Sequence, residues 1–238
     1  MTPQETLMAR IGGELAILNR TIVECRKCPR LVEWREKVAR EKRRAFMDWE
    51  YWGKPVPGFG DPKAKLLILG LAPAAHGANR TGRMFTGDRS GDFLYEALYH
   101  AGFANQPLSI RRDDGLALLG AYISATARCA PPANQPLPDE LANCRPYLER
   151  EIEILKPKAV LALGGIAMRV YLSLLKERGV IPSLAAFPFR HGGSYKLPGK
   201  LPHLFASYHP SQQNTFTGVL TPEMLSRLLI DIRRFLDD

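Results

Sequence analysis

The sequence predicts an α/β fold: a single domain with a mostly parallel central sheet that is flanked by helices on both faces. Short apolar runs bounded by turn residues are typical of buried strands, and residues 65–70 form the clearest of them. Amphipathic helical patterns alternate with these runs along the chain, as they do around a parallel sheet. The 238 residues are enough for one large domain, and the sequence contains no internal repeat or low-complexity tail.

The amino-terminal part, residues 1–62, is expected to be helix and loop within that single domain of residues 1–238. Residues 6–20 carry apolar side chains at helical spacing. Residues 31–44 alternate basic and acidic side chains, as a solvated or phosphate-facing helix does. Residues 49–62 combine prolines, glycines and aromatics, which indicates an ordered loop.

The rest of the chain is expected to alternate strands and helices. Apolar runs predict the strands, and helical periodicity with capping residues predicts the helices between them. The expected strands are residues 65–70, 121–127, 159–163 and 204–208. The expected helices are residues 91–98, with Ser90 as the cap, and residues 138–155, 166–176 and 222–236.

The composition favours a polyanionic partner. Lysine and arginine total 33 against 24 acidic residues, which gives a formal net charge of +9. Nucleic acid is the commonest partner of so basic a chain, although many basic proteins bind none. No apolar run reaches the roughly eighteen residues of a membrane-spanning helix. Residues 1–20 carry acidic side chains and lack a small-residue cleavage site, so we expect no signal peptide and a cytoplasmic location.

Four cysteines suggest a metal centre. Cys25 and Cys28 form a Cys-x-x-Cys pair whose sulfurs can point the same way, whereas Cys129 and Cys144 come from a distant part of the chain. Four thiolates suit either a tetrahedral zinc ion or a [4Fe–4S] cluster, and the spacing alone does not choose between them. Buried thiols without any ligand are the third interpretation.

Three loops follow the carboxyl ends of expected strands, where α/β folds gather their functional groups. They are residues 71–89, 128–137 and 209–218. In the first loop, glycines allow the backbone to approach a ligand closely, and there is no Gly-Lys-Ser/Thr phosphate-binding motif. In the last loop, His209 stands just past a strand and before a proline, where it is well placed to donate a hydrogen bond.

The first and last of these loops resemble the motifs of the uracil-DNA glycosylase superfamily. The first reads Gly-Leu-Ala-Pro-Ala-Ala-His-Gly from Gly70 and continues as Gly-Arg-Met-Phe-Thr-Gly, and the last reads His-Pro-Ser from His209. With the four cysteines, these strings are similar to the iron–sulfur families 4 and 5. Family 4 has a glutamate where this chain has Leu71, and the Arg-Cys-Ala-Pro-Pro-Ala-Asn string that ends at Asn134 looks like family 5. The resemblance is therefore to family 5.

The resemblance implies a DNA repair enzyme that flips uracil out of DNA and hydrolyses its N-glycosidic bond, leaving an abasic site. It also implies a structural [4Fe–4S] cluster on Cys25, Cys28, Cys129 and Cys144. Small residues in the first loop predict relaxed base choice, with hypoxanthine and other deaminated or modified bases accepted. The expected partner is single- or double-stranded DNA. A monomer is expected because base excision needs no symmetry.

The resemblance also suggests roles for individual residues. His209 is the expected donor to uracil O2, or else a core histidine at a strand end. Asp88 matches the carboxylate that activates water in family 5, with a helix-capping aspartate as the alternative. Phe85 is expected to stack on the base, or simply to pack the loop. Asn134 is a candidate for the base edge, or an asparagine of a proline-rich turn. The other expected substrate contacts are Gly70, Leu71, Ala72, Ala74, Ala75 and His76.

Residues 211–214 are expected to fill the gap that a flipped base leaves in the duplex, and Arg80, Arg83 and Arg89 to hold phosphates. The main competing interpretation is a non-enzymatic, metal-stapled nucleic-acid-binding protein, which explains the charge and the cysteines but not the two loops. A family 4-like enzyme with strict uracil specificity is disfavoured by the first loop. An unrelated α/β nucleotide hydrolase would need phosphate or metal-carboxylate motifs, which the sequence lacks.

Overall fold

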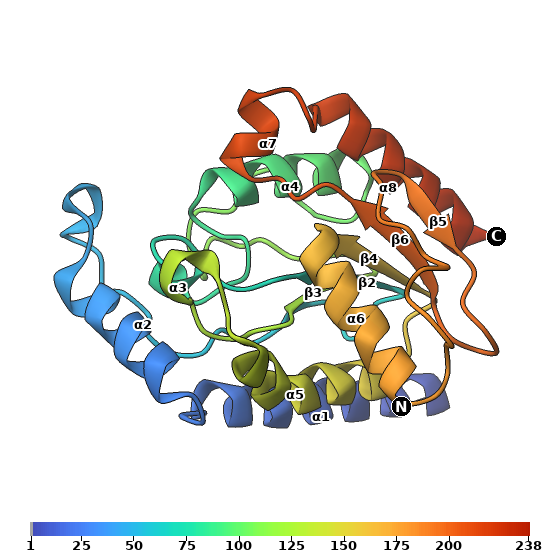
Figure 1. The fold of residues 1–238 in the computed structure, drawn as a ribbon, viewed down its shortest axis with the longest axis horizontal. Helices are drawn as coiled ribbons and strands as arrows, with labels where there is room; N and C mark the ends of the chain where they lie inside the picture. The colour runs from blue at the N-terminus through green and yellow to red at the C-terminus, as the bar shows by residue number, and fades with distance from the viewer. Residues whose placement is uncertain (1) are drawn as a thin grey trace.

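A computed structural model describes residues 2–238, and Figure 1 shows their arrangement. The strands are β1 (Phe59–Gly60), β2 (Leu66–Gly70), β3 (Ala121–Ala125), β4 (Ala159–Leu163), β5 (Gly193–Tyr195) and β6 (His203–Ser207). The helices are α1 (Pro3–Val23), α2 (Pro29–Glu41), α3 (Ala78–Thr81), α4 (Arg89–His100), α5 (Pro138–Leu155), α6 (Gly165–Glu177), α7 (Gln212–Phe216) and α8 (Pro222–Asp237). Two short 3-10 helices, η1 (Arg44–Phe46) and η2 (Pro132–Asn134), complete the elements.

The strands form one six-stranded sheet in the order β1-β3-β2-β4-β6-β5. The four inner strands are parallel to one another, and β1 and β5 pair antiparallel at the two edges. All four expected strands are present and form this parallel centre. The predicted α/β fold with a mostly parallel sheet is thus confirmed.

The side chains of β2 alternate between two hydrophobic cores, because successive residues of a strand point to opposite faces of a sheet. Leu66 and Ile68 join the core beneath α4 and α8. Leu67 and Leu69 join the core beneath α1, α5 and α6. All four leucine and isoleucine side chains are fully buried. This is why the strand reads as an unbroken apolar run and not as an alternating one.

The helix boundaries follow from local chemistry. Asp88, and not Ser90, caps α4: its carboxylate accepts a hydrogen bond from the Gly91 amide at 3.0 Å. The α8 helix begins with the pair Thr221 and Pro222, in which the threonine side chain accepts from a backbone amide and the proline occupies the first turn. These caps set the ends of the two helices that cover one face of the sheet.

The short elements β1, β5, α3 and α7 are absent from the sequence-based expectations. Each has two to five residues, and elements of this length depend on contacts with distant parts of the chain more than on their own pattern. None of the helices among the described residues is long and apolar enough to cross a membrane.

Candidate active site

The loops that follow β2 and β6 meet at the carboxyl edge of the sheet and enclose a pocket. Its empty space is about 360 Å³. Five of the expected site residues line it together: Ala72, Ala74, Phe85, Asp88 and His209. The backbone thus brings together side chains from two loops more than a hundred residues apart, as expected for the end of a parallel sheet.

His209 lies at the base of this pocket in an electrically neutral state. Burial lowers the pKa of His209 to about 4, so the imidazole carries no charge near neutral pH. Its backbone carbonyl accepts a hydrogen bond from the Asn214 side chain at 2.8 Å, which ties the loop after β6 to α7. A neutral imidazole can donate one hydrogen bond to a carbonyl oxygen without placing a positive charge in the pocket.

The Phe85 ring packs beside the His209 ring, with 5.9 Å between the ring centroids and 35° between the planes. Gly70 makes room for it, since a Cβ on Gly70 would lie 3.0 Å from the phenyl ring. Phe85 itself has a positive φ of 51°, an uncommon backbone conformation for a bulky residue. Such strain is kept where the surroundings fix the residue, and functional sites are the usual place.

Asp88 combines two roles that the sequence presents as alternatives. It caps α4, and its carboxylate also lines the pocket. Burial raises the pKa of Asp88; the nearby Asp92 adds to the shift, whereas the Gly91 and Ser90 amides and Arg80 oppose it. The carboxylate is therefore held in a poorly hydrated position, where its charge acts strongly on anything bound beside it.

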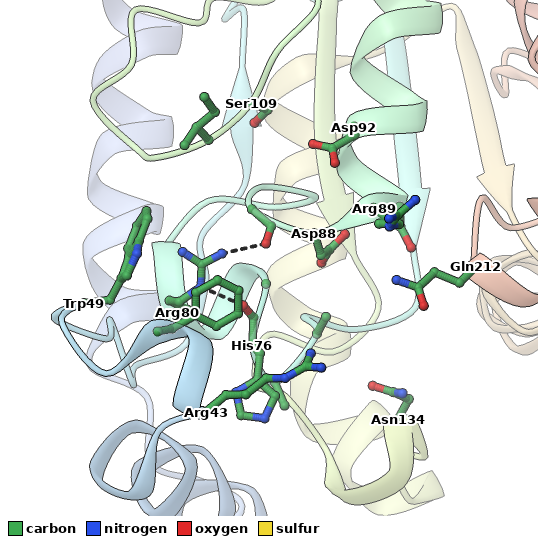
Figure 2. Close-up of a pocket in the computed structure, with 17 residues that line it drawn as sticks. Arg43, Trp49, His76, Arg80, Asp88, Arg89, Asp92, Ser109, Asn134 and Gln212 are labelled. Carbon is green, nitrogen blue, oxygen red and sulfur yellow. Dashed lines mark hydrogen bonds between the residues drawn. The ribbon is translucent and has the colours of Figure 1, made fainter.

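A second, wider cavity opens from the pocket as a groove, shown in Figure 2, with about 1580 Å³ of empty space. Ala74, Asp88 and Ser90 line both cavities, so the pocket opens into the groove at these residues. Three expected site residues lie in the groove and not in the pocket: Ala75, His76 and Asn134. Gln212, from the segment expected to fill the gap in the duplex, also lines it.

Two other residues of the first loop face away from the pocket. Leu71 lines a separate apolar cavity on the far side of His209, together with Phe189 and Tyr208. The His76 ring contacts the Tyr51 hydroxyl at 3.1 Å, and burial lowers the pKa of His76. These positions make both residues neighbours of the pocket and not part of its wall.

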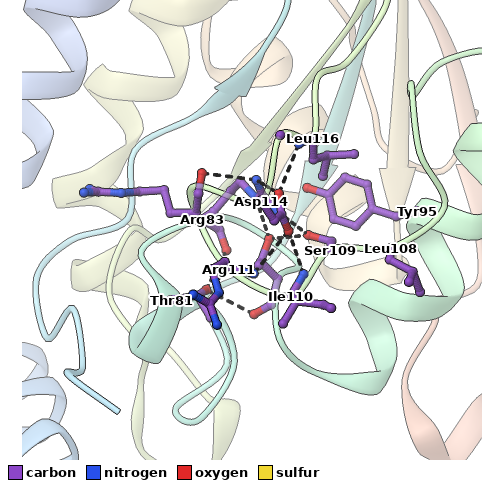
Figure 3. A network of polar contacts seen from close by, with 12 residues as sticks. Thr81, Arg83, Tyr95, Leu108, Ser109, Ile110, Arg111, Asp114 and Leu116 are labelled. Carbon is purple, nitrogen blue, oxygen red and sulfur yellow. Dashed lines mark hydrogen bonds and ion pairs between the residues drawn. The ribbon is translucent and has the colours of Figure 1, made fainter.

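A network of hydrogen bonds and one ion pair, drawn in Figure 3, holds the first loop in place. Arg83 is 2% exposed and donates to both carboxylate oxygens of Asp114, at 2.8 and 2.7 Å. It also donates to Thr86 at 2.9 Å and Ser109 at 2.8 Å. The Tyr95 hydroxyl donates to the Met84 carbonyl at 2.9 Å. The expectation that Arg83 holds a phosphate is wrong, because its guanidinium is buried and bound within the protein.

The four cysteines come together at a different place, between α2, the loop after β3, and α5. They line one cavity of about 290 Å³, and none of them forms a disulfide. A zinc ion needs its four sulfurs within about 2.3 Å of one centre. Among the side chains that the structure describes, no group of three His, Cys, Asp or Glu residues has the spacing of a metal site. Four cysteine side chains that line one cavity are a donor set for either a zinc ion or an iron–sulfur cluster.

Arg35 adds a charge to this cysteine centre. It is 2% exposed, and its guanidinium donates to the Cys129 sulfur at 2.8 Å and to the Cys25 carbonyl at 3.3 Å. The Asn143 side chain donates to the Cys28 sulfur at 3.5 Å. Donors that point at sulfur stabilise thiolates, which are the form that binds metals.

Comparison with known proteins assigns the fold and the pocket to a family. Residues 57–233 match the Uracil DNA glycosylase superfamily. The chain is also 51% identical over 225 residues to a type-5 uracil-DNA glycosylase of Mycobacterium tuberculosis, covering 94% of this chain and 82% of that protein. The chain belongs to the uracil-DNA glycosylase superfamily.

Within the uracil-DNA glycosylase superfamily, the type-5 form is favoured over the type-4 form. A type-5 relative from Thermus thermophilus is 52% identical, over 90% of this chain and 94% of its own length. A type-4 relative from Sulfurisphaera tokodaii is 30% identical, over 68% of this chain and 67% of its own length. The family 5 resemblance expected from the first loop is confirmed.

Some residues at the site of this uracil-DNA glycosylase superfamily member are missing from the sequence-based prediction. Ser90 and Met84 line the pocket, and Arg43, Phe46 and Trp49 line the groove. The sequence presents Ser90 only as a helix cap. Arg43, Phe46 and Trp49 lie outside the post-strand loops, and the one sequence signal for them is a basic run followed by aromatics.

Proposed function

We propose that this chain removes uracil from DNA by hydrolysing the N-glycosidic bond, leaving an abasic site. The observation that carries the proposal is the convergence of neutral His209, the Phe85 ring and the Asp88 carboxylate on one pocket. Type-5 uracil-DNA glycosylases at 44–52% identity support the choice of base. DNA, single- or double-stranded, is the corresponding partner, and the formal charge of +9 favours it.

His209 is proposed to donate a hydrogen bond to uracil O2 as negative charge develops on the leaving base. Because its pKa is about 4, the imidazole acts as a neutral donor over the whole physiological pH range. Donors arranged in advance around a developing anion are a large part of enzymatic rate enhancement, and the loss of one costs on the order of 2.7–4 kcal/mol.

Asp88 is proposed to act on the sugar side of the same bond. The transition state of glycoside cleavage resembles an oxocarbenium cation, which a nearby carboxylate stabilises. The same carboxylate can orient the attacking water, since Asp88 lines both the pocket and the solvent-filled groove. Its burial strengthens either interaction, because charges interact more strongly in a poorly hydrated site.

Phe85 is proposed to stack on the flipped base, because every base presents a π-face. The small side chains of Ala72 and Ala74 line the same pocket and carry no polar group that would read a base edge. We therefore propose that hypoxanthine and other deaminated or modified bases are accepted as well. A damaged or mispaired base also costs less to extrude from the duplex, which adds selectivity without any contact.

The cysteine centre is proposed to hold a [4Fe–4S] cluster on Cys25, Cys28, Cys129 and Cys144. Its support is the cavity that the four cysteines share and the hydrogen bond that Arg35 donates to the Cys129 sulfur. When bound, the cluster supplies covalent cross-links between the start of α2, the loop after β3 and α5. The protein itself holds these three segments close together and stabilises the thiolates.

We also propose that residues 1–62 belong to the same domain as the rest of the chain and that the protein acts as a monomer. Leu15 of α1 is buried in the core that β2 and α5 share, which supports one folding unit. Base excision needs only one pocket and one strand, so it requires no partner subunit. Chromosomal DNA as the substrate agrees with the expected cytoplasmic location.

The test is base release from a labelled oligonucleotide that contains one deoxyuridine, with wild type compared against His209→Ala. His100→Ala serves as a matched control, since His100 is exposed at the end of α4 and away from the pocket. We expect alkali-labile sites from wild type and the control, and a loss of about a hundredfold or more in His209→Ala. A folded protein that binds DNA and never releases uracil would move the non-enzymatic binding protein to first place.

A further inference from the structure

The groove continues beyond Asp88 to a segment that the proposed mechanism does not use. Residues 42–49, named here the arm, follow α2 and contain η1. In Figure 1, α2 and the arm extend to one side of the molecule, away from the central sheet. In Figure 2, Arg43 and Trp49 of the arm border the same groove that Asp88 lines.

Arg80 connects the arm to the first loop, residues 71–89. The Arg80 guanidinium carbon lies 3.9 Å from the Phe46 ring centroid and 4.0 Å from that of Trp49. The same guanidinium donates to the His76 carbonyl at 2.8 Å and to the Gly87 carbonyl at 2.6 Å. Arg80 therefore joins the arm to both sides of the loop that carries Asp88.

One hydrogen-bond donor of Arg80 has no acceptor. It is 3% exposed and lines the groove, yet its Nη1 has no hydrogen-bond partner among the described residues 2–238. A buried guanidinium nitrogen without a partner is costly, and such a group usually has an acceptor in the working complex. An acceptor that enters the groove beside the arm would meet this requirement.

The exposed arginines around the arm have no acidic partners. Arg43, Arg44 and Arg111 form no ion pair within the part of the chain that the structure describes, and the Arg111 guanidinium lies 5.8 Å above the Trp49 ring. On α5, by contrast, Arg145 and Arg150 are paired with glutamates. Arg43 lines the groove itself. Unpaired guanidinium groups in and around a groove are the usual form of a phosphate-binding surface.

The acidic residues of the groove lie apart from the arm. Asp88 and Asp92 line the groove beside Arg89, and their carboxylates would repel a phosphate placed against them. Arg43 and Trp49 of the arm border a different part of the groove from these carboxylates. The charge pattern thus matches a strand whose sugar lies near the carboxylates and whose next phosphates lie at the arm.

We propose that the arm, with Arg80 and Arg111, is a subsite for the sugar–phosphate backbone of the damaged strand beside the flipped nucleotide. The inference rests on the proposed function, because it takes the pocket to hold a base of that strand. The enzyme then recognises the backbone next to the flipped nucleotide, whatever base that nucleotide carries.

The test uses the full-length protein and single-stranded oligonucleotides that contain a tetrahydrofuran abasic analogue, which the enzyme does not consume. The flank is extended one nucleotide at a time on the 5′ or the 3′ side, and binding is measured by fluorescence anisotropy at several salt concentrations. The variant is the double substitution Arg43→Ala, Arg44→Ala. Lys158→Ala, Lys200→Ala is the matched control, since both lysines are exposed and precede β4 and β6 at the opposite edge of the sheet.

For wild type and the lysine variant, we expect affinity to rise when the flank on one side reaches the arm. In the arginine variant this rise should be lost, and the log–log salt slope should fall by about 0.7 for each phosphate contact removed. Equal gains in all three proteins would overturn the proposal. Uracil release from a short oligonucleotide by the wild type tests the proposed function separately. A failure of the proposed function can therefore be distinguished from a failure of the proposed subsite.

Discussion

Gly77 and Asp88 face each other across the first loop with no room for a methyl group between them. A Cβ on Gly77 would lie 1.9 Å from Asp88 Oδ2 and 2.8 Å from its Cγ. The loop therefore fixes the position of the carboxylate through a residue with no side chain. Gly77 is needed for close approach, because any side chain at this position would overlap the Asp88 carboxylate.

Gly77→Ala is expected to displace the Asp88 carboxylate and to lower the rate of uracil release by about a hundredfold, the usual effect of a misplacement of 1 Å at a catalytic group. The measurement is single-turnover base release. Gly13→Ala is the control, because a Cβ there meets nothing within 4 Å and lies inside α1. It should leave the rate unchanged and stabilise the fold by about 0.5–1 kcal/mol. Equal rates for the two variants would contradict the assigned position of Asp88.

The rate of uracil release should depend on pH through Asp88 and not through His209. Burial raises the pKa of Asp88, so the carboxylate takes up a proton at a higher pH than an ordinary aspartate does. Activity that needs the charged carboxylate should fall as pH decreases through this raised pKa. The pKa of His209 is about 4, so the imidazole stays neutral from neutral down to mildly acidic pH.

The check is a profile of kcat/KM against pH for wild type and Asp88→Asn. The asparagine variant should show a low rate without the acidic limb. An acidic limb that persists in Asp88→Asn would assign the titration to another group, of which Asp92 is the nearest in the groove, and burial raises its pKa also.

Asp114→Ala should destabilise the fold strongly, because it leaves Arg83 buried without its partner. The cost of breaking a buried pair in this way is about 3–5 kcal/mol, measured as the free energy of unfolding in urea. Asp113→Ala, at an exposed neighbouring position, should change stability by no more than about 0.5 kcal/mol. If the two variants were equally stable, the network of Figure 3 would not be what holds the loop.

The same pair predicts how stability changes in acid. Burial alone would raise the pKa of Asp114, but hydrogen bonds from Arg83 and from the backbone amides of Leu116, Ile110 and Arg111 lower it from 3.8 to about 2. A carboxyl group with a depressed pKa stabilises the fold above its unfolded pKa. That stabilisation should be lost as the pH falls from about 4 toward 2, and Asp114→Asn should lose it already at neutral pH.

Removal of the proposed cluster should loosen the amino-terminal part of the protein. Cys129→Ser is expected to abolish the brown colour and the bound iron, and to increase proteolysis between α1 and α2. Iron and sulfide analysis of the wild type should give four of each per chain. One zinc ion per chain and a colourless protein would refute the [4Fe–4S] proposal.

The sheet and the main site residues were predictable because their signals are local. A short, unbroken apolar run such as residues 66–69, bounded by turn residues, is typical of a strand buried on both faces. His209 and Asp88 follow strands directly or stand just before a helix, so the rule for the ends of parallel strands is enough to bring them together.

The buried arginines could not be predicted in the same way. Arg35 and Arg83 lie in polar sequence, and their burial depends on Cys129 and Asp114, which are distant in the chain. Asn79 is also fully buried, and its side chain donates to the Arg35 carbonyl. Such residues are identified only when the tertiary contacts that satisfy them are known.

The loop that carries Phe85 and Asp88 has little regular structure, yet its polar side chains are almost completely buried. Asn79, Arg80, Thr81, Arg83 and Thr86 are each less than a tenth exposed. Ordering a flexible loop of this length during binding would oppose recognition of every base. Here that entropy is lost once, as the chain folds, and the enzyme meets each successive nucleotide with its pocket already formed.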